Sequence, residues 1–213
     1  MKAVFTCGGT GGHINPALAV ARVLLERRPD SEILFVGAED GMEATLVPRE
    51  GFRLETLQIS SYMRSLKPSA IRHNIRAALS IRRALKKADR IIRDFQPDVI
   101  LGTGGYASYP MLHEGARLGI PTAVHESNAV PGLATKMVAD KVDRILVSFA
   151  DSRSAYRDPS RVIAVGMPVR EEFVFTRRAD ARRALGLDEK TPMIVSAWGS
   201  LGAREMNKKI AQF

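Results

Sequence analysis

The sequence predicts a doubly wound α/β fold, in which a parallel sheet is covered by helices on both faces. Short apolar segments alternate with helical patterns along the 213 residues, as they do in parallel sheets with crossover helices. Two of the apolar segments run directly into glycine-rich loops, at residues 8–12 and 102–105. In such sheets ligands bind at the carboxyl ends of the strands, so these loops also predict where a site would form.

The first elements show the alternation most clearly. Residues 2–7 and 32–36 are expected to form short buried strands. The helix predicted between them has its apolar stripe at Ala17, Leu18, Val20, Ala21, Leu24 and Leu25. Further strands are predicted at residues 97–102, 122–124, 144–147 and 161–165.

A long amphipathic helix is predicted to end near residue 95. Its apolar residues recur at steps of three and four and form one face, which we expect to pack on the sheet. These residues are Ile71, Ile75, Ala78, Ile81, Leu85, Ala88, Ile92 and Phe95.

A domain boundary is predicted at the segment Gly166-Met167-Pro168. Residues 1–167 would form an N-terminal domain, and residues 168–213 the start of a second α/β domain. In that second part we expect a helix over residues 179–185, a strand at 193–197 and another helix after residues 199–203. One strand and two helices are too few to bury a core of their own.

Composition is that of a globular protein, with 45% hydrophobic and 26% charged residues. The single cysteine, Cys7, argues against a disulfide framework and suits a reducing cytoplasm. We expect neither a secretory signal nor a membrane span, because no apolar run is long enough. The net charge of +9 is concentrated in residues 64–94, which hold ten basic and two acidic residues.

The loop Gly8-Gly9-Thr10-Gly11-Gly12-His13 lies between a predicted strand and a predicted helix. Glycine backbone amides and a helix N-terminus together suit a phosphate group. The loop is not a dinucleotide fingerprint, since Ile14 stands where the third glycine is needed, and no Walker lysine follows. The alternative is a glycine-rich turn without a ligand, with His13 as an ordinary residue at a helix start.

Two further motifs follow predicted strands. Gly102-Thr103-Gly104-Gly105-Tyr106 is a second glycine loop, and His125-Glu126-Ser127-Asn128 combines a histidine, a carboxylate and an amide. The latter set suits proton transfer and hydroxyl recognition. Its alternative is a simple turn in which Glu126 is solvated.

The basic residues of the long helix fall off its apolar face and are expected to be exposed. A solvated charged surface is one interpretation, and contact with anionic lipid headgroups is the other. Nucleic acid is disfavoured, because no aromatic residues interleave the basic ones. These residues are Arg72, Arg76, Arg82, Arg83, Lys86, Lys87, Arg90 and Arg93.

In this order the motifs resemble the MurG family, inverting glycosyltransferases of the GT-B fold. The matching pieces are GGTGGH with Pro16, Gly41-Met42-Glu43-Ala44, GTGGYASYP, HESNAVPG, GMPVR and WGSLGA. The departures are Met167 where the family usually has Asn, Ser127 where it has Gln, and WGSLGA where it has GGSQGA.

The resemblance implies transfer of N-acetylglucosamine from UDP to the 4-hydroxyl of lipid I, giving lipid II at the cytoplasmic face of the membrane. It also implies that the N-terminal domain holds the acceptor. The acceptor diphosphate would lie on the glycine loops around Gly11, Gly104 and Gly105. Contacts to UDP-N-acetylglucosamine would come from Thr10, Gly11, Gly12, Asn128, Arg170 and Ser200.

His13 is the first candidate for the base, because imidazole accepts protons near neutral pH, and Glu126 is the second. Arg170 and the amides around Ser200 would stabilise the departing diphosphate. We expect no cofactor and no tightly bound metal, since the Asp-x-Asp form of the carboxylate-x-carboxylate metal motif does not occur. Arg82, Arg83, Lys86 and Lys87 would dock on anionic membrane.

Two alternatives stand beside the enzyme. The chain is either a non-catalytic half that binds the acceptor and docks on the membrane, or a truncated piece that needs the rest of the second domain. A sugar-nucleotide epimerase, which shares the two-domain fold, is disfavoured by the acceptor loops and the basic helix.

Overall fold

The computed structural model describes residues 1–59, 68–197 and 204–212, and the side chains of these residues other than 68–79 and 172. The chain divides into two compact units, Met1–Pro168 and Val169–Phe213. Each is described by itself below.

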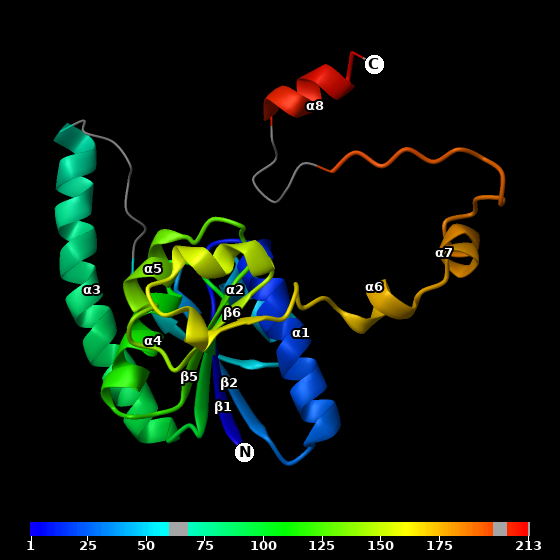
Figure 1. Ribbon diagram of the computed structural model, residues 1–213. Helices are drawn as coiled ribbons and strands as arrows, with labels where there is room; N and C mark the ends of the chain where they lie inside the picture. The colour runs from blue at the N-terminus through cyan, green and yellow to red at the C-terminus, as the bar shows by residue number, and fades with distance from the viewer. Residues whose placement is uncertain (60–67, 198–203, 213) are drawn as a thin grey trace. The chain divides into compact units, whose positions relative to one another are not determined.

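The first unit is built on one parallel sheet with the strand order β3-β2-β1-β4-β5-β6-β7 (Figure 1). The predicted doubly wound α/β fold is therefore confirmed. The strands are β1 (Lys2–Thr6), β2 (Glu32–Ala38), β3 (Arg53–Leu57), β4 (Val99–Gly102), β5 (Thr122–Glu126), β6 (Arg144–Val147) and β7 (Val162–Ala164). β3 was not predicted, because its charged residues Arg53 and Glu55 hide an edge strand in which only Leu57 is fully buried.

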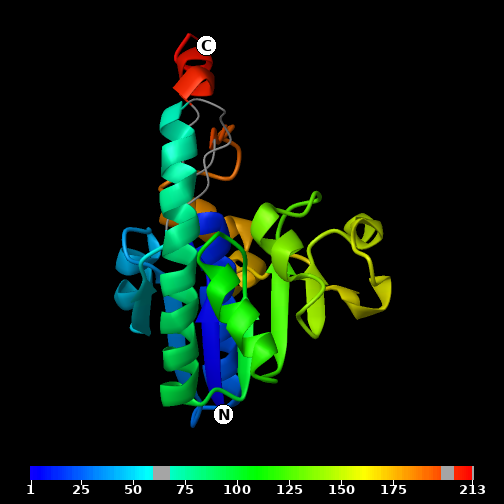
Figure 2. The ribbon, with the colours of Figure 1, turned by 90° about the vertical axis from the view of Figure 1, so that its left-hand side faces the viewer.

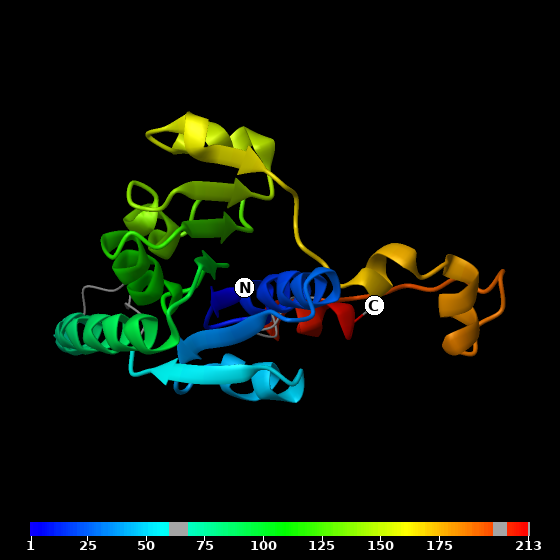
Figure 3. The same cartoon turned by 90° about the horizontal axis from the view of Figure 1, so that it is seen from below.

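Helices cover both faces of the sheet (Figure 3). α1 (Gly11–Arg27) and α2 (Glu43–Arg49) pack on one face. α3 (Pro68–Phe95), α4 (Ser108–Arg117) and α5 (Leu133–Val138) pack on the other. Two short 3-10 helices, Ala150–Ala155 and Pro159–Arg161, precede β7.

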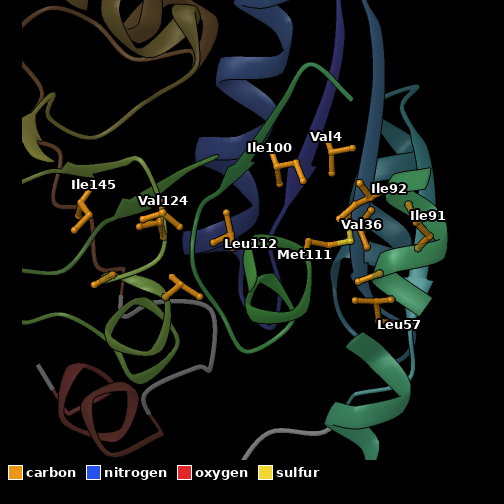
Figure 4. Packing of buried hydrophobic residues seen from close by; sticks show 14 of the residues in the cluster. Val4, Val36, Leu57, Ile91, Ile92, Ile100, Met111, Leu112, Val124 and Ile145 are labelled. Carbon is orange, nitrogen blue, oxygen red and sulfur yellow. The ribbon is translucent and has the colours of Figure 1, made fainter. Parts of the chain in front are cut away.

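The period of two in each strand divides the core into two apolar clusters. In β1, Val4 points to the α3 and α4 side, where it joins Met111, Leu112 and Ile92 (Figure 4). Phe5 points to the α1 side and stacks on Phe35 with ring centroids 5.3 Å apart. Because the strands at the centre are buried on both faces, they read as continuous apolar runs.

The predicted long helix is confirmed as α3, which stands along one side of the sheet (Figure 2). From residue 80 onward, Ala84, Ala88, Ile91 and Ile92 are buried against the sheet. Of the predicted apolar face, Ala88 and Ile92 are buried and Ile81, Leu85 and Phe95 are half-buried, whereas Ala84 and Ile91 were not predicted. The helix ends at Phe95, and Gln96 follows with a positive φ of 54°. The side chains of Ile71, Ile75, Ala78, Arg72 and Arg76 lie outside the described residues.

The second unit contains α6 (Glu171–Phe175), α7 (Arg178–Ala184) and α8 (Arg204–Ile210). The helix predicted at 179–185 is confirmed within one residue, and Gly186 follows it with φ +69° as a helix-ending glycine does. The strand predicted at 193–197 is wrong: these residues form no strand, and Ile194 is 95% exposed. A strand needs a neighbour for its backbone hydrogen bonds, and none lies among residues 169–197 and 204–212.

Candidate active site

The strand order places a topological switch point between β1 and β4. From β1 the chain continues to β2 on one side, and from β4 to β5 on the other. The loops that leave these two neighbouring strands therefore diverge and leave a crevice at the carboxyl edge, where doubly wound folds bind ligands. Both glycine-rich motifs lie in these loops.

The two glycine loops pack backbone against backbone. Gly105 has φ +82°, and a Cβ there would lie 2.1 Å from the carbonyl oxygen of Gly8. A Cβ on Gly8 would in turn lie 2.6 Å from the Cβ of Ala107. Since neither position tolerates a side chain, the glycines are explained by close approach as well as by any bound phosphate.

His13 lies in the first turn of α1, and both its side chain and its backbone carbonyl group are held by hydrogen bonds. Its Nδ1 lies 3.0 Å from the carbonyl oxygen of Gly8 and 3.4 Å from Thr10 Oγ1. Because a carbonyl oxygen only accepts, Nδ1 carries the proton, and Nε2 keeps its lone pair in the neutral ring. The Thr103 hydroxyl donates to the His13 carbonyl oxygen over 2.6 Å and ties α1 to the second glycine loop. A Cβ on Gly104 would be 2.8 Å from the imidazole, so the ring packs directly on that glycine.

Glu126 ends β5 and is buried, with 3% of its surface exposed. The interpretation of this residue as a solvated side chain in a turn is therefore wrong. Burial raises the pKa of its carboxyl group, but hydrogen bonds from Thr135, Gly132 and Asn128 outweigh burial and leave that pKa below its usual range.

A cavity of about 290 Å³ opens where these segments meet. It brings together five of the predicted site residues, namely His13, Gly104, Gly105, Glu126 and Asn128. The remaining wall is mostly apolar and comes from α3, α4, α5 and the residue before it, the second residue after β3 and the second glycine loop. These residues are Ile59, Ile81, Tyr106, Tyr109, Gly132, Leu133, Ala134, Thr135 and Met137.

Other predicted site residues do not line this cavity. Thr10, Gly11 and Gly12 lie at the start of α1, directly before His13 in the chain, and are not among the residues that line the cavity. Arg170 belongs to the second unit, where its guanidinium lies 5.4 Å from the Phe173 ring centroid. Ser200 lies outside the described residues. The assignment of these residues to the sugar nucleotide stays a prediction.

His125, beside Glu126 in the sequence, points away from the cavity. It is buried, and its Nε2 lies 3.0 Å from the Gly166 carbonyl oxygen and 3.3 Å from Ser148 Oγ. Burial lowers its pKa. This histidine therefore anchors the segment that leaves β7 and contributes nothing to the cavity wall.

Glu43 lies within the motif Gly41-Met42-Glu43-Ala44 but was not predicted to have a role in the site. Glu43 is completely buried and accepts hydrogen bonds from the backbone N–H of Ala38 (2.7 Å) and of Gly9 (3.2 Å). It thus ties the first glycine loop to the end of β2. The sequence signal for this role is the pair Gly37 and Gly41 shortly before Glu43. In the fold these two glycines and Gly8 leave room for the Glu43 carboxylate.

The four basic residues of α3 predicted to meet a membrane, Arg82, Arg83, Lys86 and Lys87, are all exposed. Within the described part of the chain, none of the four pairs with an acidic side chain, whereas Arg93 on the same helix pairs with Asp89 at 2.9 Å. Within residues 1–59, 68–197 and 204–212, no helix is long and apolar enough to cross a membrane. No cluster of three or more His, Cys, Asp or Glu side chains in the same residues is arranged to hold a metal ion.

Comparison with known proteins places this site in context. Residues 3–147 match the glycosyltransferase family 28 N-terminal domain. The chain is 40% identical over 212 residues to the UDP-N-acetylglucosamine–N-acetylmuramyl-(pentapeptide) pyrophosphoryl-undecaprenol N-acetylglucosamine transferase of Acetivibrio thermocellus, and it spans 56% of that protein. A relative of the same name from Caldanaerobacter subterraneus is 39% identical, with 57% of its length spanned.

Comparison with solved structures leads to the same family. Acinetobacter baumannii MurG superposes with a TM-score of 0.68 at 25% identity, over 98% of this chain and 55% of that one. The UDP-GlcNAc 2-epimerase of Methanocaldococcus jannaschii gives 0.56 at 12% identity, over 78% of this chain and 46% of the epimerase, which shows a shared fold alone. The chain thus spans little more than half the length of the relatives it matches.

Proposed function

The chain belongs to glycosyltransferase family 28, and from this membership we propose that it forms the acceptor-binding part of an inverting glycosyltransferase. The proposed reaction moves N-acetylglucosamine from UDP-N-acetylglucosamine to the 4-hydroxyl of the N-acetylmuramoyl unit of lipid I, and lipid II is the product. Relatives at 39–40% identity carry the name of this activity. Their greater length means that the activity belongs to a longer protein than these 213 residues.

The observation that carries the proposal is the imidazole of His13 at the switch point. Its Nδ1–H donates to the Gly8 carbonyl oxygen, so Nε2 is the basic atom of the ring, in the wall of the cavity. The glycine loops beside it expose backbone amides at the start of α1, where a diphosphate is favoured by the helix N-terminus.

The proposed chemistry is a single displacement. As the acceptor hydroxyl oxygen attacks the anomeric carbon, Nε2 of His13 takes the hydroxyl proton, and the bond from that carbon to the UDP oxygen breaks. Attack on the face opposite the leaving group inverts the sugar carbon. Arg170 and the backbone around Ser200 are proposed to stabilise the negative charge that UDP carries away.

The proposal is tested with the protein at the full length of its relatives. Supplied with lipid I and UDP-N-acetylglucosamine, it should form lipid II. The 213 residues alone should not do so at a useful rate, because holding two substrates in one geometry supplies about 7–11 kcal/mol of such barriers. Absence of lipid II with the full-length protein would refute the proposed function. Fast turnover by the 213 residues alone would refute the proposal that they form only the acceptor-binding part.

Peripheral attachment to the cytoplasmic face of the membrane forms the second part of the proposal. Four exposed cations on α3 have no acidic partner among the residues that the structure describes, and each basic residue near an anionic surface contributes about 1 kcal/mol. Co-sedimentation with acidic vesicles should therefore weaken when Arg82, Arg83, Lys86 and Lys87 are replaced by Gln, and also as salt rises. The matched control removes four exposed cations elsewhere, Arg27, Arg28, Lys141 and Arg144, and should lose less binding. Equal loss in both variants would contradict a docking role for α3.

A further inference from the structure

The carboxylate of Glu126 is saturated with hydrogen bonds from the segment that follows it. Oε1 accepts from the backbone N–H of Asn128 at 2.9 Å and from its side-chain Nδ2 at 2.7 Å. Oε2 accepts from the backbone N–H of Gly132 at 2.9 Å and from the Thr135 hydroxyl at 2.6 Å. A carboxylate has about four acceptor positions, so all of them are used.

This saturation makes Glu126 a poor base. To take up a proton on Oε2, it must give up a bond from the Gly132 N–H or from the hydroxyl of Thr135, which is only 2% exposed; on Oε1 it must give up a bond from Asn128, which is exposed. Leaving a buried donor such as the Thr135 hydroxyl unpaired is costly, and either route loses a charge-assisted hydrogen bond. His13, in contrast, has an unprotonated nitrogen in the same cavity wall.

The same bonds fix the orientation of Asn128. A carboxamide has a donor end and an acceptor end, and only the donor end suits a carboxylate. With Nδ2 bonded to Glu126, the oxygen Oδ1 is the end left for other groups, and Asn128 lines the cavity. A group that meets Oδ1 there must be a hydrogen-bond donor.

We propose that Glu126 is a positioning residue rather than the base: it turns the Asn128 carboxamide so that Oδ1 faces the cavity and accepts from a hydroxyl or amide N–H of a sugar substrate. The inference rests on the proposed function for the identity of the substrate, but not for the orientation itself. Sugars that carry an N-acetyl group present both kinds of donor.

Glu126→Ala is the informative substitution because it removes both acceptor oxygens. Glu126→Gln is less decisive: if its amide nitrogen takes the place of Oε2, the remaining oxygen still accepts from Asn128, and the Asn128 carboxamide must flip only if that nitrogen takes the place of Oε1. Glu114→Ala is the matched control, since Glu114 is also buried at 6% exposure but pairs with Arg117 outside the cavity.

The first measurement uses the 213-residue chain and needs no substrate. In its ¹⁵N–¹H spectrum, one Asn128 side-chain amide proton should exchange slowly with water, and Glu126→Ala should abolish that protection. Glu114→Ala should preserve it. Unchanged Asn128 signals in Glu126→Ala would overturn the orientation, independently of any activity.

The second measurement uses full-length protein and a double-mutant cycle. Glu126→Ala should raise the KM of the substrate that Asn128 binds about 5- to 10-fold, as expected for one lost hydrogen bond, with a smaller change in kcat. In an Asn128→Ala background, Glu126→Ala should raise this KM no further, because Glu126 acts through Asn128. A loss of kcat of about 10²–10⁴ that persists in that background would make Glu126 the base and overturn the proposal. Absence of transfer in the unmutated protein would instead refute the proposed function and leave the spectroscopic result standing.

Discussion

The two units of this chain use similar apolar content in different ways. In Met1–Pro168 the largest apolar side chains, such as Phe35 and Ile14, are fully buried between sheet and helices. In the described part of Val169–Phe213 most large apolar side chains are exposed, with Phe173 at 72% and Ile194 at 95%. The difference is a sheet: the first unit has seven paired strands, and the described part of the second has none.

Among residues 169–197 and 204–212, the side chain that is buried is a charged one. Arg182 is 6% exposed, and its guanidinium donates to the carbonyl oxygens of Asp188 and Thr191. These bonds hold a single turn together, whereas a carboxylate such as Glu43 in the first unit holds two segments of the site. A rigid site therefore forms where a core supports the loops, and the candidate base lies in that unit.

The largest expected effect concerns the base. In full-length protein His13→Ala should lower kcat about 10²–10⁴-fold and leave the KM of both substrates nearly unchanged, because the loss falls on the transition state. His113→Ala, on α4 and outside the cavity lining, is the matched control and should retain kcat. If His13 instead only binds the acceptor diphosphate, the acceptor KM will rise while kcat is kept.

The contrast in burial predicts unequal costs for the same substitution. Phe35→Ala removes a ring that is completely buried and should lower the free energy of unfolding by about 3–5 kcal/mol. Phe173→Ala removes an exposed ring and should change it by less than about 0.5 kcal/mol. Urea denaturation of the 213-residue chain measures both. Similar losses would show that the second unit has a core that includes Phe173.

Glycines sharpen the comparison further. Gly105 and Gly186 both have positive φ, +82° and +69°, so alanine is strained at each by about 1–3 kcal/mol. Only at Gly105 would the added Cβ strike backbone, 2.1 Å from the Gly8 oxygen, whereas nothing lies within 4 Å at Gly186. Gly105→Ala should therefore lower the melting temperature more than Gly186→Ala. Equal shifts would mean that the two glycine loops are not packed together.

The sequence predicted those features that depend on interactions between residues close together in the chain. The first strand, the long helix and the two glycine loops were predictable, because apolar period and glycine spacing are local signals. The strand at 193–197 failed since an apolar run becomes a strand only when another strand pairs with it.

The same distinction between local and long-range interactions applies to the site. His13 and Asn128 were predicted from their motifs, but the bond from Thr135 to Glu126 joins a strand end to a helix nine residues later. Nothing in the local pattern announces that contact. The edge strand β3 was missed for a related reason, because its solvated charges broke the apolar pattern.

The most direct test of the central claim, that the acceptor site lies in the first unit, is a titration of the 213-residue chain followed by ¹⁵N–¹H spectra. The probe is a water-soluble prenyl-diphosphoryl-N-acetylmuramoyl analogue. We expect saturable shifts in the backbone amides of residues 8–13 and 104–106, with residues 169–197 and 204–212 unchanged. Shifts confined to the second unit, or none at saturating probe in a folded chain, would contradict the account.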